Sequence, residues 1–218
     1  MWQSIILKAP QDISLDDFFT KFVPDRFNQL KNSLNSIDFS FLTGRDFKMQ
    51  FNIGGKVYSV TFRNGKDMKV TKGSIDGANF IVTLSEKDWR DAASGKFNEL
   101  TDDFTGNPAS FIDANHYETL MSMNGMVNMN LRKKDGVNFP LSLVFNGEKS
   151  PSVTVHLDML DALQLMNQST TGLRLLMNGR LKFTGSILLL MKLQNLIQGI
   201  TGLGRFALGQ QKILSKTL

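Results

Sequence analysis

Few residues in this chain have the types and spacing that catalysis requires. His116 stands in the stretch DANHYE between Asp113 and Glu118, where an imidazole beside carboxylates would be able to move protons. His156 falls on the polar side of an alternating run from Val153 to Leu157, so we expect solvent or an element that covers the sheet as its neighbour. Motifs for zinc proteases, thiol redox sites, serine hydrolases, P-loops and dinucleotide binding are absent from the sequence. The sequence therefore predicts a non-enzyme with no catalytic residue, metal or cofactor, and leaves lipid chemistry at His116 as the weaker alternative.

The acidic pairs and the absence of cysteine agree with the prediction of a non-enzyme. Asp16-Asp17 and Asp102-Asp103 are explained by helix starts and loops, because carboxylates favour the first turn of a helix. No cysteine occurs among the 218 residues, which excludes disulfides and thiol chemistry and is typical of a reducing compartment.

Charge and hydropathy restrict the partners. The net charge is +5, but the basic residues are spread along the chain. The densest cluster, Arg132-Lys133-Lys134, precedes the turn signal Asp135-Gly136, so we expect a solvated turn, with membrane docking as the alternative.

The aromatic residues of the predicted strands alternate with polar residues in a way that buries the rings, so no nucleic acid partner is expected. The start of the chain does not resemble a signal peptide, and the longest apolar window, Ile187–Met191, is far short of the ~20 residues that a membrane span needs. The sequence predicts a soluble cytoplasmic protein.

The first half combines helices with a group of strands. Ser14 starts a capping box, and apolar residues at helical spacing follow on both sides of Pro24, which predicts two short helices or one kinked helix. Four alternating segments come next, separated by the turn signals Gly54-Gly55 and Asn64-Gly65, and Ser85 then caps a helix. We expect an antiparallel meander followed by a helix, which is an α+β pattern.

The second half has the same order of predicted strands, turns and helices. A helix is predicted over Ala109–Met123, and alternating segments follow with turns at Asp135-Gly136 and Asn146-Gly147, then a helix from Asp158 to about Gln168. SVTFRNG and FIVTLSEKDWRDAASG correspond to SLVFNG and SVTVHLDMLDALQLMNQ. Two interpretations stay open. The similarity is either a degenerate internal repeat or the pattern that β-hairpins have in general.

The most informative stretch is Leu175–Ile197, which reads LLMNGRLKFTGSILLLMKLQNLI. A turn at Asn178-Gly179 leads into a short strand, and Ser186 then caps a helix whose apolar residues cover more than one stripe. A surface helix needs about 100° of apolar stripe, so this helix has more apolar surface than one contact uses. Burial on two sides in a packed core is one explanation. A cavity for an apolar ligand, or contact with a membrane, is the other. Beyond it, a glycine-rich apolar end is either a flexible cover or a docking tail.

This stretch resembles the sterol carrier protein family, the nonspecific lipid-transfer domain. Its members have a Gly-Lys-Leu strand ending in Gly, followed by an apolar helix that contains Met-Lys-Leu. GRLKFTGSILLLMKLQNL is similar, with Arg180 in place of the Lys and Phe183 in place of a β-branched residue. The stretch ANFIVTLSEKDWRDAASGKFN resembles the family's strand–Ser–helix segment, and FFTKFVPDRFNQL resembles its first helix. The matching residues of the terminal motif are Gly179, Leu181, Gly185, Met191, Lys192 and Leu193.

The resemblance implies an α+β fold, a mainly antiparallel twisted sheet of five or more strands covered by helices, with a hydrophobic tunnel between the sheet and the last helix. The chain departs from the family at about 98–176, where an inserted or repeated unit separates two segments that are close together in the family. We therefore expect a single domain over 1–218, with 14–107 and 108–198 as pseudo-repeats if the unit is a repeat. The chain ends in SKTL rather than the peroxisomal SKL.

The function expected from this reading is the binding or transfer of a lipid or other hydrophobic small molecule, such as a fatty acyl, sterol-like or isoprenoid compound. The alternative is a non-catalytic accessory or scaffold subunit that docks on a partner enzyme or a membrane through its apolar C-terminal region. A transient contact with a membrane surface is a further expected partner. The 11 methionines suit an adaptable apolar site. The expected lining residues are the inward strand residues and the apolar helix residues Phe51, Tyr58, Val60, Phe62, Val82, Phe183, Leu189, Met191, Leu193 and Leu196.

Overall fold

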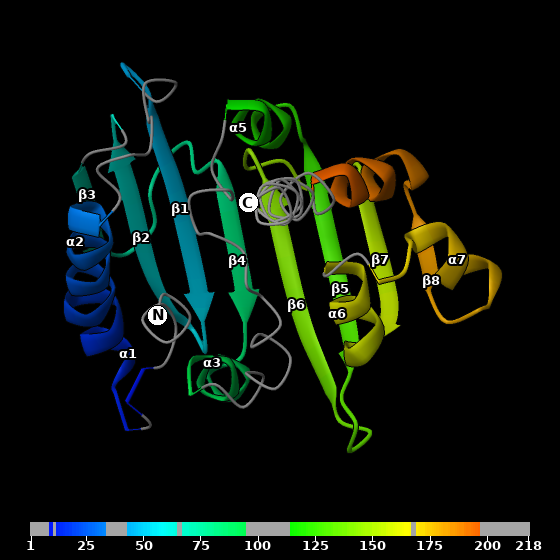
Figure 1. The fold of residues 1–218 in the computed structure, drawn as a ribbon. Coiled ribbons are helices and arrows are strands. Elements are labelled where there is room, and N and C mark those ends of the chain that lie inside the picture. Colours follow the sequence, from blue (N-terminus) through cyan, green and yellow to red (C-terminus); the bar gives the residue numbers. More distant parts are fainter. Residues whose placement is uncertain are drawn as a thin grey trace, which may run out of the picture.

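One mixed β-sheet runs across the whole molecule (Figure 1). The computed structural model describes residues 9–10, 12–33, 43–64, 67–94, 114–166 and 169–196. In these residues eight strands pair in the order β3-β2-β1-β4-β6-β5-β7-β8. The expected α+β class is confirmed. The strands are β1 (Asp46–Ile53), β2 (Lys56–Arg63), β3 (Asp67–Lys72), β4 (Phe80–Leu84), β5 (Gly125–Arg132), β6 (Asn138–Phe145), β7 (Ser152–Asp158) and β8 (Lys182–Gly185).

The meander expected for the first four strands is wrong at β4. β1, β2 and β3 pair antiparallel in chain order, but β4 lies beside β1 and runs parallel to it. The connection from β3 to β4 crosses the outer face of the sheet, where polar side chains hold it. The Ser59 hydroxyl donates to the Gly73 carbonyl at 2.6 Å, and the Ile75 amide donates to the Gln50 side chain at 3.2 Å. The alternation of apolar and polar residues could not predict this crossover, because it indicates which face of the sheet a side chain occupies and not which strands are neighbours.

The second half repeats this pairing scheme. β5 and β6 form an antiparallel hairpin, β7 runs parallel to β5, and a helix follows β7 as one follows β4. Asn64 and Asn146 end the second strand of each hairpin, and among the described residues they are the non-glycine positions with positive φ. Asn64 accepts the Gly44 amide at 2.8 Å, while Asn146 donates to the carbonyls of Met121 and Met123. Each asparagine therefore anchors the segment that enters the first strand of its own hairpin.

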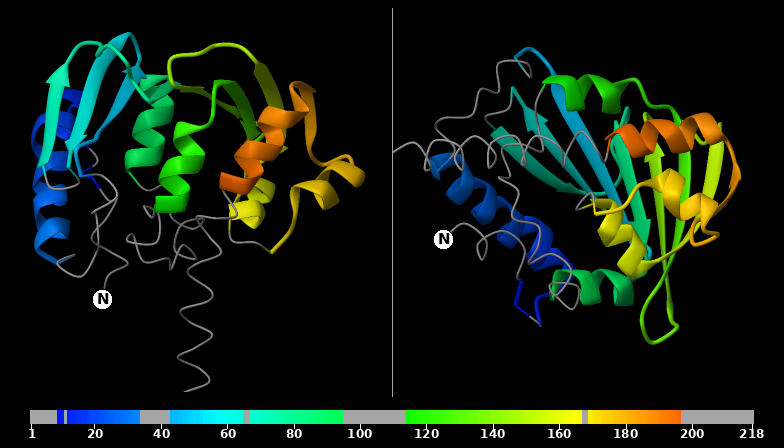
Figure 2. Two further views of the ribbon diagram at one scale, coloured as in Figure 1. Left: turned by 90° about the horizontal axis from the view of Figure 1, so that it is seen from above. Right: turned by 45° about the vertical axis from the view of Figure 1, so that its right-hand side comes forward.

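All helices in the described residues lie on one side of the sheet, which we call the inner face (Figure 2). The first helical stretch covers β2 and β3, and α3 and α5 lie at opposite ends of the central strands (Figure 1). The remaining helices cover β5 and β7 and the edge at β8. The elements are α1 (Leu15–Asp17), the π-helix η1 (Phe18–Phe22), α2 (Val23–Ser33), α3 (Glu86–Ala93), α5 (Ala114–Met121), α6 (Met159–Met166), α7 (Gly172–Met177) and the helical residues 187–196.

The predicted caps and hairpin turns that lie in the described residues are confirmed. The Ser14 hydroxyl accepts the Asp17 amide, and the Ser85 hydroxyl accepts the Asp88 amide, both at 3.0 Å. The Gly54-Gly55 turn joins β1 to β2 with positive φ at both glycines. Pro24 is accommodated by the π-helical turn directly before α2, because proline cannot donate the usual backbone hydrogen bond. The expected stop at Gly95 lies outside the described residues.

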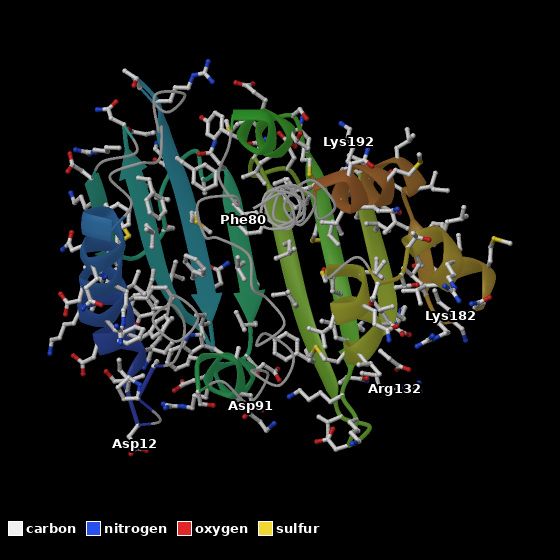
Figure 3. All side chains as sticks on the ribbon, viewed as in Figure 1. Asp12, Phe80, Asp91, Arg132, Lys182 and Lys192 are labelled. Atoms are coloured by element: carbon white, nitrogen blue, oxygen red, sulfur yellow. The ribbon has the colours of Figure 1, made fainter. Side chains whose placement is uncertain are left out.

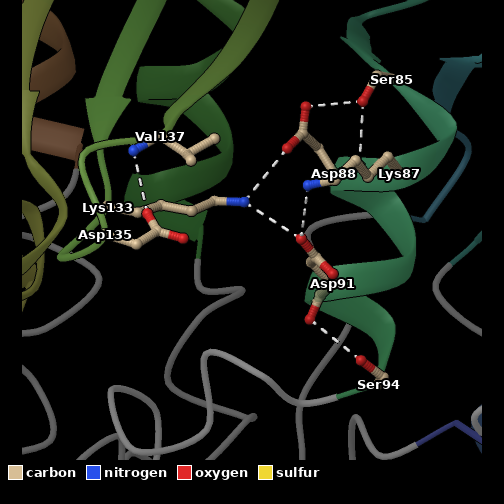
Figure 4. A network of polar contacts seen from close by, with 8 residues as sticks. All are labelled: Ser85, Lys87, Asp88, Asp91, Ser94, Lys133, Asp135 and Val137. Atoms are coloured by element: carbon tan, nitrogen blue, oxygen red, sulfur yellow. Dashed lines mark hydrogen bonds and ion pairs between the residues drawn. The ribbon is translucent and has the colours of Figure 1, made fainter.

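The cluster Arg132-Lys133-Lys134 is not a fully solvated turn, so that expectation is wrong at its centre. The Lys133 side chain is 12% exposed and its Nζ lies 3.4 Å from Asp88 Oδ1 and 3.2 Å from Asp91 Oδ2, both on α3 (Figure 4). Arg132 is exposed and pairs with Asp158, which holds the pKa of that carboxyl below its usual range. The sequence places Asp88 and Asp91 on one side of a predicted helix. It does not show that Lys133, which is 45 and 42 residues further along the chain, lies against them. Lys133 therefore joins the second half of the chain to the first.

Two apolar clusters fill the space between sheet and helices. The N-terminal cluster is rich in aromatic rings, and the C-terminal cluster is mainly aliphatic. The partly buried Leu84 packs against both. The buried members of the N-terminal cluster are Leu15, Phe19, Ile53, Tyr58, Val60 and Trp89. Those of the C-terminal cluster are Met123, Val127, Leu131, Phe139, Phe145, Val153, Val155, Leu157, Leu175, Leu181, Leu189, Leu193 and Leu196.

A polar contact fixes the first helix to β2. The Tyr58 hydroxyl donates to Asp16, whose other carboxylate oxygen pairs with Lys72 at 2.8 Å. The Tyr58 ring is buried and stacks on Phe19, with ring centroids 4.4 Å apart. Burial, and then the hydrogen bond to Asp16, raise the pKa of Tyr58 to about 12. The Lys72 ammonium and the Tyr58 hydroxyl lower the pKa of Asp16.

This contact predicts a loss of stability at alkaline pH. The unfolded Tyr58 ionises near pH 10, but the folded one ionises only near pH 12. The free energy of unfolding should therefore fall by about 2 to 3 kcal/mol between these values, at 1.36 kcal/mol per pKa unit. Urea unfolding of the wild type and of Tyr58→Phe at pH 9, 10.5 and 12 measures this. Tyr58→Phe keeps the ring but should lack this part of the decline. An equal decline in both proteins would contradict the assignment.

Candidate functional site

The helix over residues 187–196 carries apolar side chains on both of its sides. Ser186 caps it, with the Leu189 amide donating to the Ser186 hydroxyl at 3.3 Å. Leu189, Leu193 and Leu196 are buried in the C-terminal cluster. On the opposite side Ile187, Leu188 and Met191 are 52%, 71% and 55% exposed. Among the described residues, only one side of this apolar helix is therefore packed against other side chains.

Glycines set the start of this helix against the sheet. At Gly185, φ is +102°, and a Cβ would lie 2.3 Å from the Ser152 carbonyl oxygen. The Ser186 amide donates to the same oxygen at 2.8 Å. At Gly125, a Cβ would lie 2.9 Å from the Leu189 side chain, so Leu189 packs directly over the first residue of β5. Side-chain atoms at these two positions would push the helix away from the inner face.

A buried ion pair holds the turn that leads into β8. Asp161 on α6 is fully buried and is bound by both the Nε and the terminal nitrogen of Arg180, with the Nε–Oδ2 distance at 3.1 Å. Arg180 is about half exposed. A bidentate guanidinium satisfies a buried carboxylate better than a lysine would. The replacement of Lys by Arg at this position therefore matches the geometry.

At the centre of the inner face the described side chains are only partly buried. Phe51, Val82 and Leu143 are direct Cα partners on adjacent strands, so their side chains share one face. All three are only partly buried, whereas the neighbours that end this row, Tyr58 and Val127, are buried. Figure 3 shows Phe80 on the same central region. We call the residues Phe51, Phe80, Val82, Met129, Leu141 and Leu143 the central floor; each is apolar and partly buried.

An open hollow adjoins the central floor. The last pair between β4 and β6 is Thr83 with Ser142, and the strands separate beyond it. The hollow in this gap has a volume of about 410 Å³. Met129 and Leu141 of the floor contribute to its walls, as does Leu84. Its other walls include Thr83, Asn128 and Ser142 of the polar outer face, so the hollow is an open recess beside the floor and not an enclosed ligand pocket.

The structure divides the ten expected lining residues between two places. Four belong to the N-terminal cluster, namely Phe51, Tyr58, Val60 and Phe62. Four belong to the C-terminal cluster, namely Phe183, Leu189, Leu193 and Leu196. Val82 lies between the two groups on β4. Met191 is two residues from Leu189 and therefore on the other side of the helix, where it is exposed. No single compartment is lined by all ten.

The floor residues of the second half were absent from the expected lining. Met129, Leu141 and Leu143 come from β5 and β6, which the sequence predicts as strands of an inserted or repeated unit. The alternation of Phe139, Leu141, Leu143 and Phe145 was a signal that one face of β6 is apolar. It could not indicate that β6 pairs with β4 and so continues the floor.

The residues considered for chemistry are not assembled. His156 is exposed on the outer face, as its place on the polar side of the run predicts. The side chain of His116 lies outside the described residues. In the part of the chain that the structure describes, no three His, Cys, Asp or Glu side chains form a group that could hold a metal ion. None of the described helices is long and apolar enough to span a membrane.

Comparison with known proteins finds a family match in the second half of the chain. Residues 110–198 match the SCP-2 sterol transfer family, which confirms the resemblance found in the sequence. The sterol carrier protein domain 2 of Helicoverpa armigera is 20% identical, with a TM-score of 0.31 over 44% of this chain and 94% of that chain. Sterol carrier protein 2 from Yarrowia lipolytica, in its apo form, is 15% identical, with a TM-score of 0.34 over 59% of this chain and 96% of that chain. Comparison with curated protein sequences gives no match. The similarity to this family rests on the match at residues 110–198.

Proposed function

We propose, from the match of residues 110–198 to the SCP-2 sterol transfer family, that this protein binds and carries a lipid or similar apolar molecule. The observation that supports this most is the helix over 187–196. It brings Leu189 and Leu193 to the inner face of the sheet, beside a central floor whose apolar side chains are only partly buried. The ligand would cover that floor. This function needs no catalytic residue.

The ligand compartment that we propose lies on the side of the C-terminal cluster. In the N-terminal cluster, aromatic rings already occupy the space. The Phe18 and Trp89 rings are 5.1 Å apart and the Phe19 and Phe51 rings 5.2 Å apart. The C-terminal cluster is mainly aliphatic, and Met129 of the floor packs against it. Thioether side chains adapt their shape to a guest more readily than stacked rings do.

Affinity in such a compartment would come from burial of the hydrocarbon. Each CH₂ group removed from water contributes about 0.8 kcal/mol. Ten such groups over the floor would contribute ~8 kcal/mol before the cost of immobilising the chain is subtracted. The floor offers no buried charge to select a headgroup, so a fatty acyl, sterol-like or isoprenoid guest fits this proposal equally.

We further propose that the chain is a pseudo-duplication in one domain, with units at 14–107 and 108–198. The support is the shared scheme of a hairpin, a strand parallel to its first member, and a following helix. In this arrangement β6 of the second unit takes the place beside β4. The middle residues 98–176 are then parts of both units and not an insertion. The cytoplasmic location and the absence of a nucleic acid partner stay predictions.

Blocking the floor tests the carrier function. Val82→Trp and Leu143→Trp each place a large ring where the ligand would lie, and we expect binding of a fluorescent fatty acid to weaken at least ~10-fold, since a few methylene contacts are lost. Thr71→Trp on the exposed outer face of β3 is the matched control and should bind as the wild type does. Circular dichroism and thermal unfolding check that each variant is folded. Equal binding by all four proteins would remove the floor from the site.

A second candidate function is that of a non-catalytic accessory subunit. The exposed apolar side of residues 187–196 favours it, because a large unpartnered apolar patch usually marks an interaction surface. If the wild type takes up no fatty acid, sterol or isoprenoid probe, this function becomes the better account.

A further inference from the structure

We propose that α7 and the helix over 187–196 together form a face that docks on an anionic lipid bilayer. The docking face is defined by five exposed apolar side chains and two cations. Leu173 and Met177 of α7 are 63% and 78% exposed, and Ile187, Leu188 and Met191 are 52–71% exposed. Arg174 and Lys192 are the exposed cations beside them. The proposal extends the carrier function, because a lipid carrier must meet the membrane that supplies its ligand, but the docking is measurable without any ligand.

The geometry of both helices turns these side chains outward. In α7, Gly172 and Leu175 are buried, which leaves Leu173 and Met177, one turn apart, on the opposite side. In 187–196 the buried side is formed by Leu189, Leu193 and Leu196. Contact between the two helices is close, since a Cβ at Gly172 would lie 2.7 Å from the Gln194 side chain. The two outward sides therefore belong to neighbouring helices.

The part of the sequence that contains both helices has no acidic residue and therefore a net positive charge. Residues 162–218 contain 7 of the 25 basic residues and none of the 20 acidic ones. The remaining 161 residues therefore hold 18 basic and 20 acidic residues, a net charge of −2. The basic residues are spread evenly, as the sequence predicts, and the excess of positive charge in 162–218 arises because no acidic residue occurs there. Arg174 and Lys192 lie beside the exposed apolar side chains, and cations beside apolar side chains are complementary to a bilayer with anionic headgroups.

A bilayer fits this face better than a protein does. The cores of protein interfaces are enriched in Tyr, Trp, Phe, Met and Arg and depleted in Lys, so this face shares Met and Arg with them but has no aromatic ring among its defining residues. The exposed side chains here are Leu, Ile and Met, and a lysine and an arginine lie beside them. Short aliphatic side chains can enter the boundary between headgroups and acyl chains, where cations contact phosphate. The same helix then meets the membrane with Leu188 and the inner face of the sheet with Leu189.

Vesicle flotation tests the docking face. Full-length protein is mixed with vesicles of phosphatidylcholine alone or with 30 mol% phosphatidylglycerol added, at low and high salt. We expect binding to the anionic vesicles, a decline with salt, and little binding to the neutral ones. Leu188→Ser with Met191→Ser should reduce binding at least ~10-fold, and Arg174→Gln with Lys192→Gln should reduce it by roughly fivefold per cation, which corresponds to ~1 kcal/mol for each charge near the surface.

Matched variants elsewhere are the controls. Val137→Ser removes an exposed apolar side chain in the β5–β6 turn, and Lys69→Gln removes an exposed cation on β3, and both should bind as the wild type does. Absence of binding to anionic vesicles, or equal loss in control and docking-face variants, would overturn the proposal. Concentration-dependent dimerisation that Leu188→Ser abolishes, without vesicle binding, would instead assign the face to a second copy of the chain. Fatty acid uptake measured without vesicles fails only if the carrier function is wrong, so the two proposals are separable.

Discussion

Replacing Gly185 by alanine should remove about 4 kcal/mol of stability, one of the largest effects that a single methyl group can have in this protein. Its φ of +102° is one that a residue with a Cβ rarely adopts, and the new methyl would lie 2.3 Å from the Ser152 carbonyl oxygen and 3.1 Å from the Val153 Cα. Both neighbours are backbone atoms of β7, so neither can move without disturbing the sheet. Differential scanning calorimetry should show a melting temperature lower by roughly 8–16 °C for a chain of this length.

Gly147→Ala is the control for this prediction. Gly147 also has positive φ, at +73°, but a Cβ there would have no atom within 4 Å. It therefore isolates the conformational cost, about 1 to 2 kcal/mol, from the clash. A similar loss in both variants would show that the backbone oxygen of Ser152 does not limit position 185. A small loss of stability in both variants would show that Gly185 does not lie against the backbone of β7.

Replacing Lys133 by methionine should cost about 3 kcal/mol, because the nearly buried Asp88 loses the Lys133 ammonium and Asp91 loses it too, although Asp91 keeps its pair with Lys87. The exposed fractions of the Lys133, Asp88 and Asp91 side chains are 12%, 9% and 13%, so solvent cannot replace the ammonium group fully. The contact joins α3 to the turn between β5 and β6. Urea unfolding followed by fluorescence of Trp89, which is buried on α3, measures the loss.

Two further variants make this prediction specific. Lys134→Met changes the exposed neighbour and should alter stability by less than ~0.5 kcal/mol. Combining Lys133→Met with Asp88→Asn and Asp91→Asn should recover part of the loss, because the cost comes from uncompensated charge and not from the missing methylenes. A triple variant that is no more stable than Lys133→Met would assign the cost to packing, for example to the contact of Lys133 with the Phe139 ring.

Local features of the fold could be predicted from the sequence because their causes are local. Ser14 and Ser85 cap helices through an amide three residues away, and Gly54-Gly55 closes a hairpin between adjacent strands. Neither needs information about distant parts of the chain. The cap at Ser186 and the two-sided apolar helix after it are of the same kind.

Features that depend on distant partners could not be predicted. The parallel pairing of β4 with β1, the pairing of β4 with β6 and the ion pairs of Lys133 each join segments that are separated by many residues. Alternation placed Phe51 and Val82 on apolar faces, but only the register shows that they are Cα partners and that Leu143 continues the row. The expected lining therefore mixed residues from two clusters. The distribution of charge was available in the sequence and was missed because the chain was considered as a whole.

Photoaffinity labelling tests the central claim, an apolar ligand on the inner face, most directly. A diazirine fatty acid is bound to the full-length protein, activated by light, and the adducts are located by peptide mass spectrometry. We predict saturable labelling of β4, β6 and the inner side of 187–196, at residues such as Val82, Leu143 and Leu193, and competition by unlabelled fatty acid. Labelling that does not saturate, or that is confined to the exposed side chains of Leu188 and Met191, would contradict the account.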